Sequence, residues 1–345
     1  QFDRGDHVLR HAVEDRLPVE FAEVAQLRPR IVVDEDIRLG AGGEDFGLDR
    51  RIGDIAQDDL HIDAERPQLV RRRVGRFRSA AVDDEIDAFA GERFDAVVSC
   101  LASRTGAPHD AWAIDHGAHM AALSVAKEAG VGQFILLSAI CVQKPKLAFQ
   151  HAKLAFEQAL SQSGLTYSIV RPTAYFKSLS GQVGRLRAGK PFLLFGDGRQ
   201  TACKPISDDD LADYIAGCLS SAERANRIWP IGGPGPAITP REQGEWLFDA
   251  LGLPPRFRSV PVALLDAIVA GLNGAAAVVP RLRAKAELAR IGRYYATESM
   301  LVLDPGNGRY DAEATPETGT DTLRDYYVRL ARGDADLERG DHAVF

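Results

Sequence analysis

Lys153 is the side chain whose type and position best suit chemistry on a ligand. It lies in a segment, residues 149–163, whose apolar residues recur at helical spacing, and Phe149, four positions earlier, shares its helix face. A helical lysine that follows a buried strand can bind ribose hydroxyls as a point charge. A solvated surface lysine is the alternative, and spacing alone does not separate the two.

Polar and small residues follow three runs that are typical of buried parallel strands. The runs are residues 94–100, 134–138 and 167–170. Ligands of open α/β sheets bind at the carboxyl ends of the strands. The residues expected at that edge are Ser99 to Ser103, Ser138 to Cys141, and Arg171 to Phe176.

Strands and helices alternate from residue 94 onward. We expect helices over 111–129, with Asp110 as the N-cap and Gly130 as the stop, over 149–163, and over 211–219 after Ser207. This order predicts an α/β fold with a Rossmann-like, doubly wound parallel sheet, followed by a smaller, mostly helical region. The predicted units are an anomalous segment 1–91, a nucleotide-binding domain 92–235 and a C-terminal substrate-binding region 236–345.

The first 90 residues differ in composition from the rest. They hold 14 Arg, no Lys and 21 Asp plus Glu, so the whole net charge of −7 lies there. Acidic clusters flank the arginines and would cancel their field, which argues against nucleic-acid binding. We hypothesise a coding region read in the wrong frame or a poorly selected extension. Translating the other two frames upstream of the Phe94 codon tests this hypothesis.

Neither a phosphate loop nor a metal site is expected. The segment 40–47 is rich in glycine but lacks the GxGxxG spacing and places Glu44 and Asp45 where a pyrophosphate would lie. His116 and His119 are three apart without a third ligand, so exposed polar side chains are expected there. The four cysteines form no metal-binding or disulfide pattern, which indicates free thiols in a reducing compartment.

The stretch 262–279 is strongly apolar. We expect a core or cofactor-covering helix, and an interfacial membrane helix, with peripheral membrane association, is the alternative. No uninterrupted run is long enough for a transmembrane helix, and no signal segment follows Gln1, so we expect a cytoplasmic protein.

Several long motifs resemble one enzyme family. The chain is similar to the NADPH-dependent type of divinyl chlorophyllide a 8-vinyl-reductases over about residues 92–345. The motifs that carry the resemblance are VVSCLASRTG at 97–106, LLSAICVQKP at 136–145, FQHAKL at 149–154, YSIVRPTAYFKSL at 167–179, FGDG at 195–198, CKPIS at 203–207, YYATESML at 294–301 and GDHAVF at 340–345.

This resemblance implies an atypical short-chain dehydrogenase (NmrA-like) Rossmann fold and reduction of an 8-vinyl group to ethyl. It implies that Lys153 holds the nicotinamide ribose and that Ser138 lies near the nicotinamide. Divinyl chlorophyllide or a related tetrapyrrole would be the substrate, and NADPH the cofactor. Cofactor contacts are expected from Ser99, Leu101, Ala102, Ser103, Pro172 and Thr173, and substrate contacts from Cys141, Tyr175, Phe176 and the helix 262–279.

Phe149 bears on the type of reaction. Many short-chain dehydrogenases place a tyrosine four residues before the lysine, as the acid that protonates a carbonyl oxygen, and phenylalanine cannot donate a proton. Ketone reduction is therefore disfavoured, and hydride delivery to a conjugated vinyl group fits better. Two alternatives stay open: an NmrA-like protein that senses a nucleotide without turnover, and a defective reductase chain that lacks its glycine-rich loop.

Overall fold

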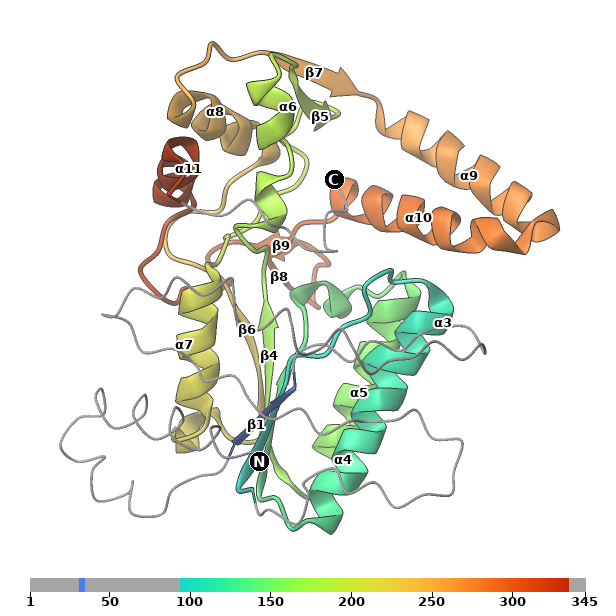
Figure 1. The fold of residues 1–345 in the computed structure, drawn as a ribbon, viewed down its shortest axis with the longest axis vertical. Helices are drawn as coiled ribbons and strands as arrows, with labels where there is room; N and C mark the ends of the chain where they lie inside the picture. Colours follow the sequence, from blue (N-terminus) through green and yellow to red (C-terminus); the bar gives the residue numbers. More distant parts are fainter. Residues whose placement is uncertain (1–30, 35–93, 335–345) are drawn as a thin grey trace, which may run out of the picture.

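The computed structural model describes residues 31–34 and 94–334, and a five-stranded parallel sheet forms the centre of this part of the chain (Figure 1). The strand order is β1-β2-β3-β4-β6, and every neighbouring pair is parallel. The strands are β1 (Ile31–Asp34), β2 (Ala96–Ser99), β3 (Gln133–Leu137), β4 (Thr166–Pro172) and β6 (Arg227–Ile231).

Helices cover both faces of this sheet, as expected for a doubly wound fold. Val97 points into a buried cluster with α4 (His119–Glu128) and α5 (Ala148–Ser161). Val98, the next residue, points into the opposite cluster with α7 (Asp208–Cys218). Because both faces are buried, β2 and β3 are largely continuous apolar runs and do not alternate with polar residues.

The helix expected over 111–129 begins earlier than predicted and contains a π-helical segment. It starts with α3 (Pro108–Asp110), continues as a π-helix, η1 (Ala111–Ala118), and ends as α4. Asp110 is not the N-cap, because it lies inside the helix, where its carboxylate accepts a hydrogen bond from the Thr105 hydroxyl. Gly130 ends the helix at a φ of 71°, as predicted.

The helix starts expected near residues 149 and 208 are confirmed, and α8 also begins with a side-chain cap. The Ser207 hydroxyl accepts a hydrogen bond from the Asp210 amide at the start of α7. Thr239 and Glu242 form a capping box at the start of α8 (Pro240–Ala250). Short 3₁₀ turns are η2 (Ile140–Gln143), η3 (Ser178–Ser180), η4 (Ala222–Arg224) and η5 (Pro280–Leu282).

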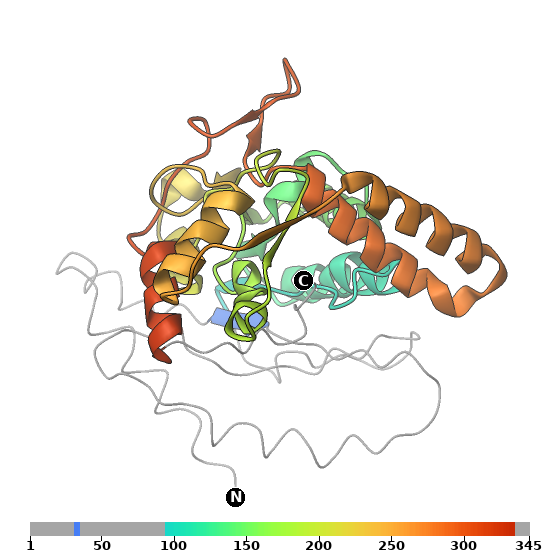
Figure 2. The ribbon, with the colours of Figure 1, turned by 90° about the horizontal axis from the view of Figure 1, so that it is seen from above.

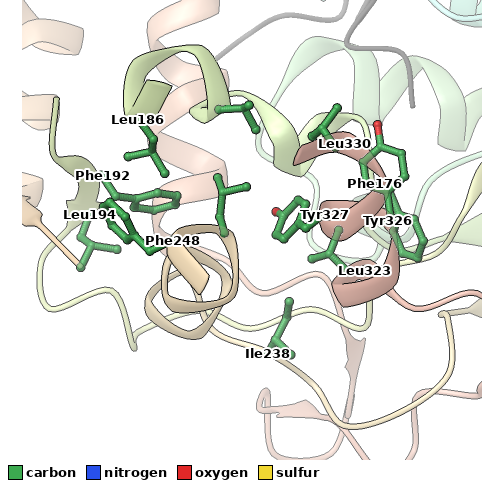
Figure 3. Close-up of a cluster of buried hydrophobic side chains, with 12 residues drawn as sticks. Phe176, Leu186, Phe192, Leu194, Ile238, Phe248, Leu323, Tyr326, Tyr327 and Leu330 are labelled. Carbon is green, nitrogen blue, oxygen red and sulfur yellow. The ribbon is translucent and has the colours of Figure 1, made fainter. Parts of the chain in front are cut away.

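A second core lies beyond the sheet domain (Figure 3). The parallel pair β5 (Phe192–Phe195) and β7 (Phe257–Val260) packs with α6 (Val183–Arg187), α8 and α11 (Leu323–Arg332). Phe176 and residues 183–194 belong to this core although they precede residue 236, so the chain passes between the two parts more than once. A small antiparallel pair, β8 (Val302–Leu303) and β9 (Tyr310–Asp311), completes the fold.

The apolar stretch 262–279 forms one arm of a helical hairpin. It contains α9 (Val262–Val278), which packs on α10 (Arg283–Thr297), and α10 lies between α9 and the sheet domain (Figure 1). Seen from above, the hairpin projects from the body of the molecule (Figure 2). Ala276 is the only buried residue of α9, so the expectation of a core helix is wrong. Within the described residues, no helix is both long and apolar enough to cross a membrane.

The end of β6 lies so close to the 204–206 segment that a side chain at Gly233 would collide with backbone. A Cβ there would be 1.8 Å from the Pro205 carbonyl oxygen. We expect Gly233→Ala to lower the free energy of unfolding by about 3 kcal/mol or more. Gly184→Ala is the matched control, because a Cβ at that α6 position meets nothing within 4 Å. Urea unfolding of both variants measures the difference, and equal effects would contradict the packing described.

Candidate functional site

The carboxyl ends of β2 and β3 meet α5 through a chain of buried polar contacts. The Lys153 ammonium lies 3.0 Å from an Asp115 carboxylate oxygen, and both side chains are almost fully buried. The Ser103 hydroxyl donates to the other Asp115 oxygen at 2.5 Å, and the Ser103 amide also donates to this carboxylate. The structure therefore brings the predicted residues Ser103 and Lys153 together and shows that Lys153 is not a solvated surface lysine.

A second buried carboxylate lies one helical turn along α5. The Ser138 hydroxyl donates to Glu157 at 2.5 Å, and Arg171, in β4, forms an ion pair with the same carboxylate. Lys153 and Glu157 are four residues apart and share a helix face. Ser138 is thus fixed at the end of β3, on the side of the sheet that also carries Lys153.

His119 is buried beside the Lys153–Asp115 pair. Its Nδ1 lies 3.1 Å from the Ile114 carbonyl oxygen, and its ring lies 4.6 Å from that of Phe156. Burial, reinforced by the Lys153 charge, lowers the pKa of His119 from 6.5 to about 4. The expectation of an exposed side chain is wrong for His119, and the neighbouring Asp115 is buried as well. No cluster that could hold a metal ion occurs among the described residues.

Asp115 was not identified as a site residue from the sequence, although a signal was present. Ala111, Asp115 and His119 are spaced by four, and they continue into the buried stripe that includes Ala122 and Ala126. A carboxylate on the apolar stripe of a helix must find a buried partner, which is rare outside sites and ion pairs. The wide π-helical turn that carries it is itself a feature that recurs at functional sites.

The predicted cofactor residues at the ends of β2 and β4 differ in their exposure and in whether their hydroxyl groups are already hydrogen-bonded. Ser99 is fully buried, and its hydroxyl has no hydrogen-bond partner within the described part of the chain. Leu101 is buried, whereas Ala102 is exposed. Pro172 is buried at the end of β4, and the Thr173 hydroxyl donates a hydrogen bond to the Lys204 carbonyl oxygen.

The Ser99 hydroxyl and the Lys153 ammonium fit the ribose side of a dinucleotide. An ammonium has three donors, and Asp115 occupies one of them, so the others can reach ribose hydroxyls. The glycine-rich segment 40–47 lies outside the described residues, as does most of the segment 1–91.

Two of the three predicted substrate residues are buried in the protein interior. Cys141, in η2, is buried, and burial raises the pKa of its thiol. Phe176 is buried in the second core, 5.5 Å from the Tyr326 ring (Figure 3). Both side chains are closed off from solvent in this structure, and their contact with a substrate stays a prediction. Tyr175 is half-buried next to the first sheet.

A partly exposed apolar surface lies over the strand ends beside these residues. Its members pack on one buried cluster and come from the ends of β3 and β4, from α5 and from α10. They are Ala139, Phe149, Ala174 and Tyr295. The Tyr295 hydroxyl points to the Cys141 sulfur at 3.9 Å, so α10 supplies a phenol to this surface that sequence reasoning missed. The expected cover over the site is thus provided by α10 and not by α9.

Three contacts position α10 over the site. The Tyr294 hydroxyl donates to the Cys141 carbonyl at 2.9 Å, and the buried Glu287 carboxylate accepts from the Ala148 amide at the start of α5. Gly106, after β2, lies so close to Ile291 that a Cβ would be 2.6 Å from its Cδ1. The α10 helix thus places the Tyr295 phenol on a partly exposed apolar surface above the Cys141 sulfur, which suits contact with an apolar molecule.

The comparisons with known proteins agree with a nucleotide site. Residues 64–222 match the family model described as NAD(P)H-binding. The match begins inside the acidic first segment of the sequence.

The chain is also a homologue of plant reductases. It is 52% identical over 257 residues to the divinyl chlorophyllide a 8-vinyl-reductase, chloroplastic, of Cucumis sativus, which is 73% of this chain and 61% of that protein. The enzymes of the same name from Zea mays and Arabidopsis thaliana are 50% and 51% identical, over 72% of this chain and 64% and 61% of theirs. The chain therefore spans less than two thirds of the length of these relatives.

Solved structures with a similar fold include the NADPH-dependent quinone oxidoreductase QOR2 from Escherichia coli in complex with NADPH. The sequences are 18% identical, the match covers 69% of this chain and 76% of that chain, and the TM-score is 0.48. RMD from Pseudomonas aeruginosa, complexed with NADPH, is 16% identical over 71% and 82% of the two chains, with a TM-score of 0.47.

The buried ion pair predicts a coupled stability effect. Lys153→Met or Asp115→Asn leaves an uncompensated group behind, and each should cost about 3 kcal/mol or more. The double variant should cost clearly less than the two single variants together, because neither charge is left alone. Chemical unfolding of the three variants checks this expectation, and additive effects would show that the pair does not exist in solution.

The lowered pKa of His119 predicts a pH-dependent stability. Between pH 6.5 and about 4 the unfolded chain takes up a proton on this residue and the folded protein does not. The free energy of unfolding should therefore fall by about 3 kcal/mol as the pH drops through this window, with no contribution lost above it. His119→Gln should remove this part of the pH dependence. His109→Gln, at an exposed position, should leave it unchanged, and the reverse pattern would refute the assignment.

Proposed function

We propose that this chain is an NADPH-dependent reductase that converts the 8-vinyl group of a divinyl chlorophyllide, or a closely related tetrapyrrole, to an ethyl group. The proposal rests on sequence similarity. Over 72–73% of the chain, about half of the aligned residues are identical to those of reductases of that name. The site supports it, because it combines groups for a nucleotide with a flat apolar surface.

The chain's own residues would position the cofactor. Bound NADPH supplies the hydride. Lys153 and Ser99 would bind its ribose side, and Asp115 holds the Lys153 ammonium at a fixed place at the strand ends. Ser138, held by Glu157, would border the nicotinamide. The buried Asp115 and Glu157 are therefore positioning residues in this proposal.

The surface over the strand ends favours reduction of a carbon–carbon double bond. Phe149 occupies the place from which a tyrosine would protonate a carbonyl oxygen, and it is part of the apolar surface with Ala139 and Ala174. A planar macrocycle lying on these side chains would exclude water from the reacting atoms. Its conjugated ring system delocalises the charge that develops when a hydride reaches the vinyl group.

Tyr295 is the best candidate for the proton donor. Hydride addition to one vinyl carbon breaks the π bond, and the other carbon then takes a proton, which gives the ethyl group and NADP⁺. Burial raises the pKa of the Tyr295 phenol and of the nearby Tyr175 phenol, so both carry a proton at neutral pH. Tyr295 belongs to the partly exposed surface, whereas the Cys141 thiol lies beneath it.

Three measurements test this function: NADPH binding by fluorescence, NADPH oxidation, and the absorbance change from divinyl to monovinyl pigment. Lys153→Ala should weaken NADPH binding and lower turnover. Tyr295→Phe should leave NADPH binding unchanged and lower turnover about 100-fold, in the range expected for loss of a general acid. Tyr310→Phe, whose hydroxyl donates to Glu298 and which is not a member of this surface, is the matched control.

The outcomes separate the alternatives. NADPH binding without turnover of any divinyl pigment would support the sensor without catalysis. Full turnover by Tyr295→Phe would exclude this tyrosine as the proton donor while leaving the reductase assignment intact. A chain that neither binds NADPH nor turns over would support the defective-chain hypothesis.

A further inference from the structure

The helix α9 carries two apolar stripes on opposite sides. The inner stripe recurs every three or four residues and consists of half-buried or buried side chains that pack toward α10. It comprises Val262, Leu265, Val269, Leu272 and Ala276. This stripe accounts for the stability of the hairpin, and a surface helix would normally present polar residues on the other side.

The outer stripe is equally apolar and has no partner within the described part of the chain. Its residues follow the same spacing and are all exposed: Leu264, Ile268, Gly271, Ala275 and Val278. Leu264 is 51% exposed, Ile268 43% and Val278 81%. Asp266 is the only charged residue of α9, and Arg293 of α10 neutralises it at 2.5 Å. The outer side of α9 is therefore a continuous row of exposed apolar residues on the projecting hairpin.

The charge around this row is opposite in sign to that of the whole protein. Residues 256–293 contain seven basic and two acidic residues, a net charge of +5, whereas the chain as a whole carries −7. Both acidic residues are paired, since Glu287 binds Arg290 at 2.9 Å and Asp266 binds Arg293. Three exposed cations, Arg281, Arg283 and Lys285, gather at the turn beside the exposed Val278 and Val279.

We propose that the outer face of α9 and the turn 278–285 bind the surface of an anionic lipid bilayer. An apolar helix face flanked by lysine and arginine inserts into the boundary of headgroups and acyl chains, while the cations bind anionic headgroups. A second copy of the chain fits less well, because two hairpins of charge +5 would repel each other. The surface is separate from the residues proposed for the reductase chemistry, since none of Lys153, Ser138 and Tyr295 belongs to it.

Vesicle flotation of the full chain tests this surface, with phosphatidylcholine alone and with phosphatidylglycerol added. The wild-type protein should bind only the anionic vesicles, and high salt should release it. The triple variant Arg281→Ser/Arg283→Ser/Lys285→Ser should bind roughly 100-fold more weakly, since each basic residue near an anionic surface contributes about fivefold. Ile268→Ser/Val278→Ser should also weaken binding, at unchanged charge.

A control keeps the test specific. Lys127→Ser/Arg199→Ser/Arg309→Ser removes three exposed cations elsewhere and should bind vesicles at least tenfold more tightly than the hairpin triple variant. NADPH binding, measured on every variant, shows that each is folded and separates this proposal from the reductase function. Equal loss in both triple variants, or no vesicle binding by the wild type, would overturn the proposal. So would a dimer, detected by light scattering, that Ile268→Ser/Val278→Ser dissociates.

Discussion

Two buried carboxylates, each paired with a cation from another element, hold the strand ends and the helices in one arrangement. Asp115 binds Lys153 of α5, and Glu157 of α5 binds Arg171 of β4. A carboxylate that is removed from water is tolerated only if a cation and hydrogen-bond donors replace its hydration. The helix that bears Asp115, the loop after β2 and the ends of β3 and β4 must therefore keep their relative positions for these charges to stay paired.

Much of the sheet domain could be predicted from the sequence, because its elements are local and strongly patterned. The strands β3 and β6 are short apolar runs with turns on both sides, and Ser207, Thr239 and Gly130 are end signals that depend on neighbouring residues alone. Even the edge of the sheet that carries the site follows from the parallel order of the strands.

The site itself depends on contacts between distant segments, which spacing does not contain. Asp115 and Lys153 are 38 positions apart, and spacing alone could not show whether Lys153 is a buried site residue or a solvated one. Tyr295 reaches Cys141 only because α10, the second arm of the hairpin, returns to the strand ends. The role of α9 was misjudged for a related reason: its composition is that of a core helix, and periodicity cannot tell whether an apolar stripe finds a partner.

The π-helix has one more consequence for the architecture around Asp115. A helix of this width holds an additional residue in its turn compared with an ordinary helix, so the segments before and after it are offset around the common axis. Deleting one residue between Ala111 and Asp115 would remove this additional residue and shift the preceding loop relative to Asp115. Ser103 would then lose the carboxylate that anchors it, although no residue that touches Lys153 had been changed.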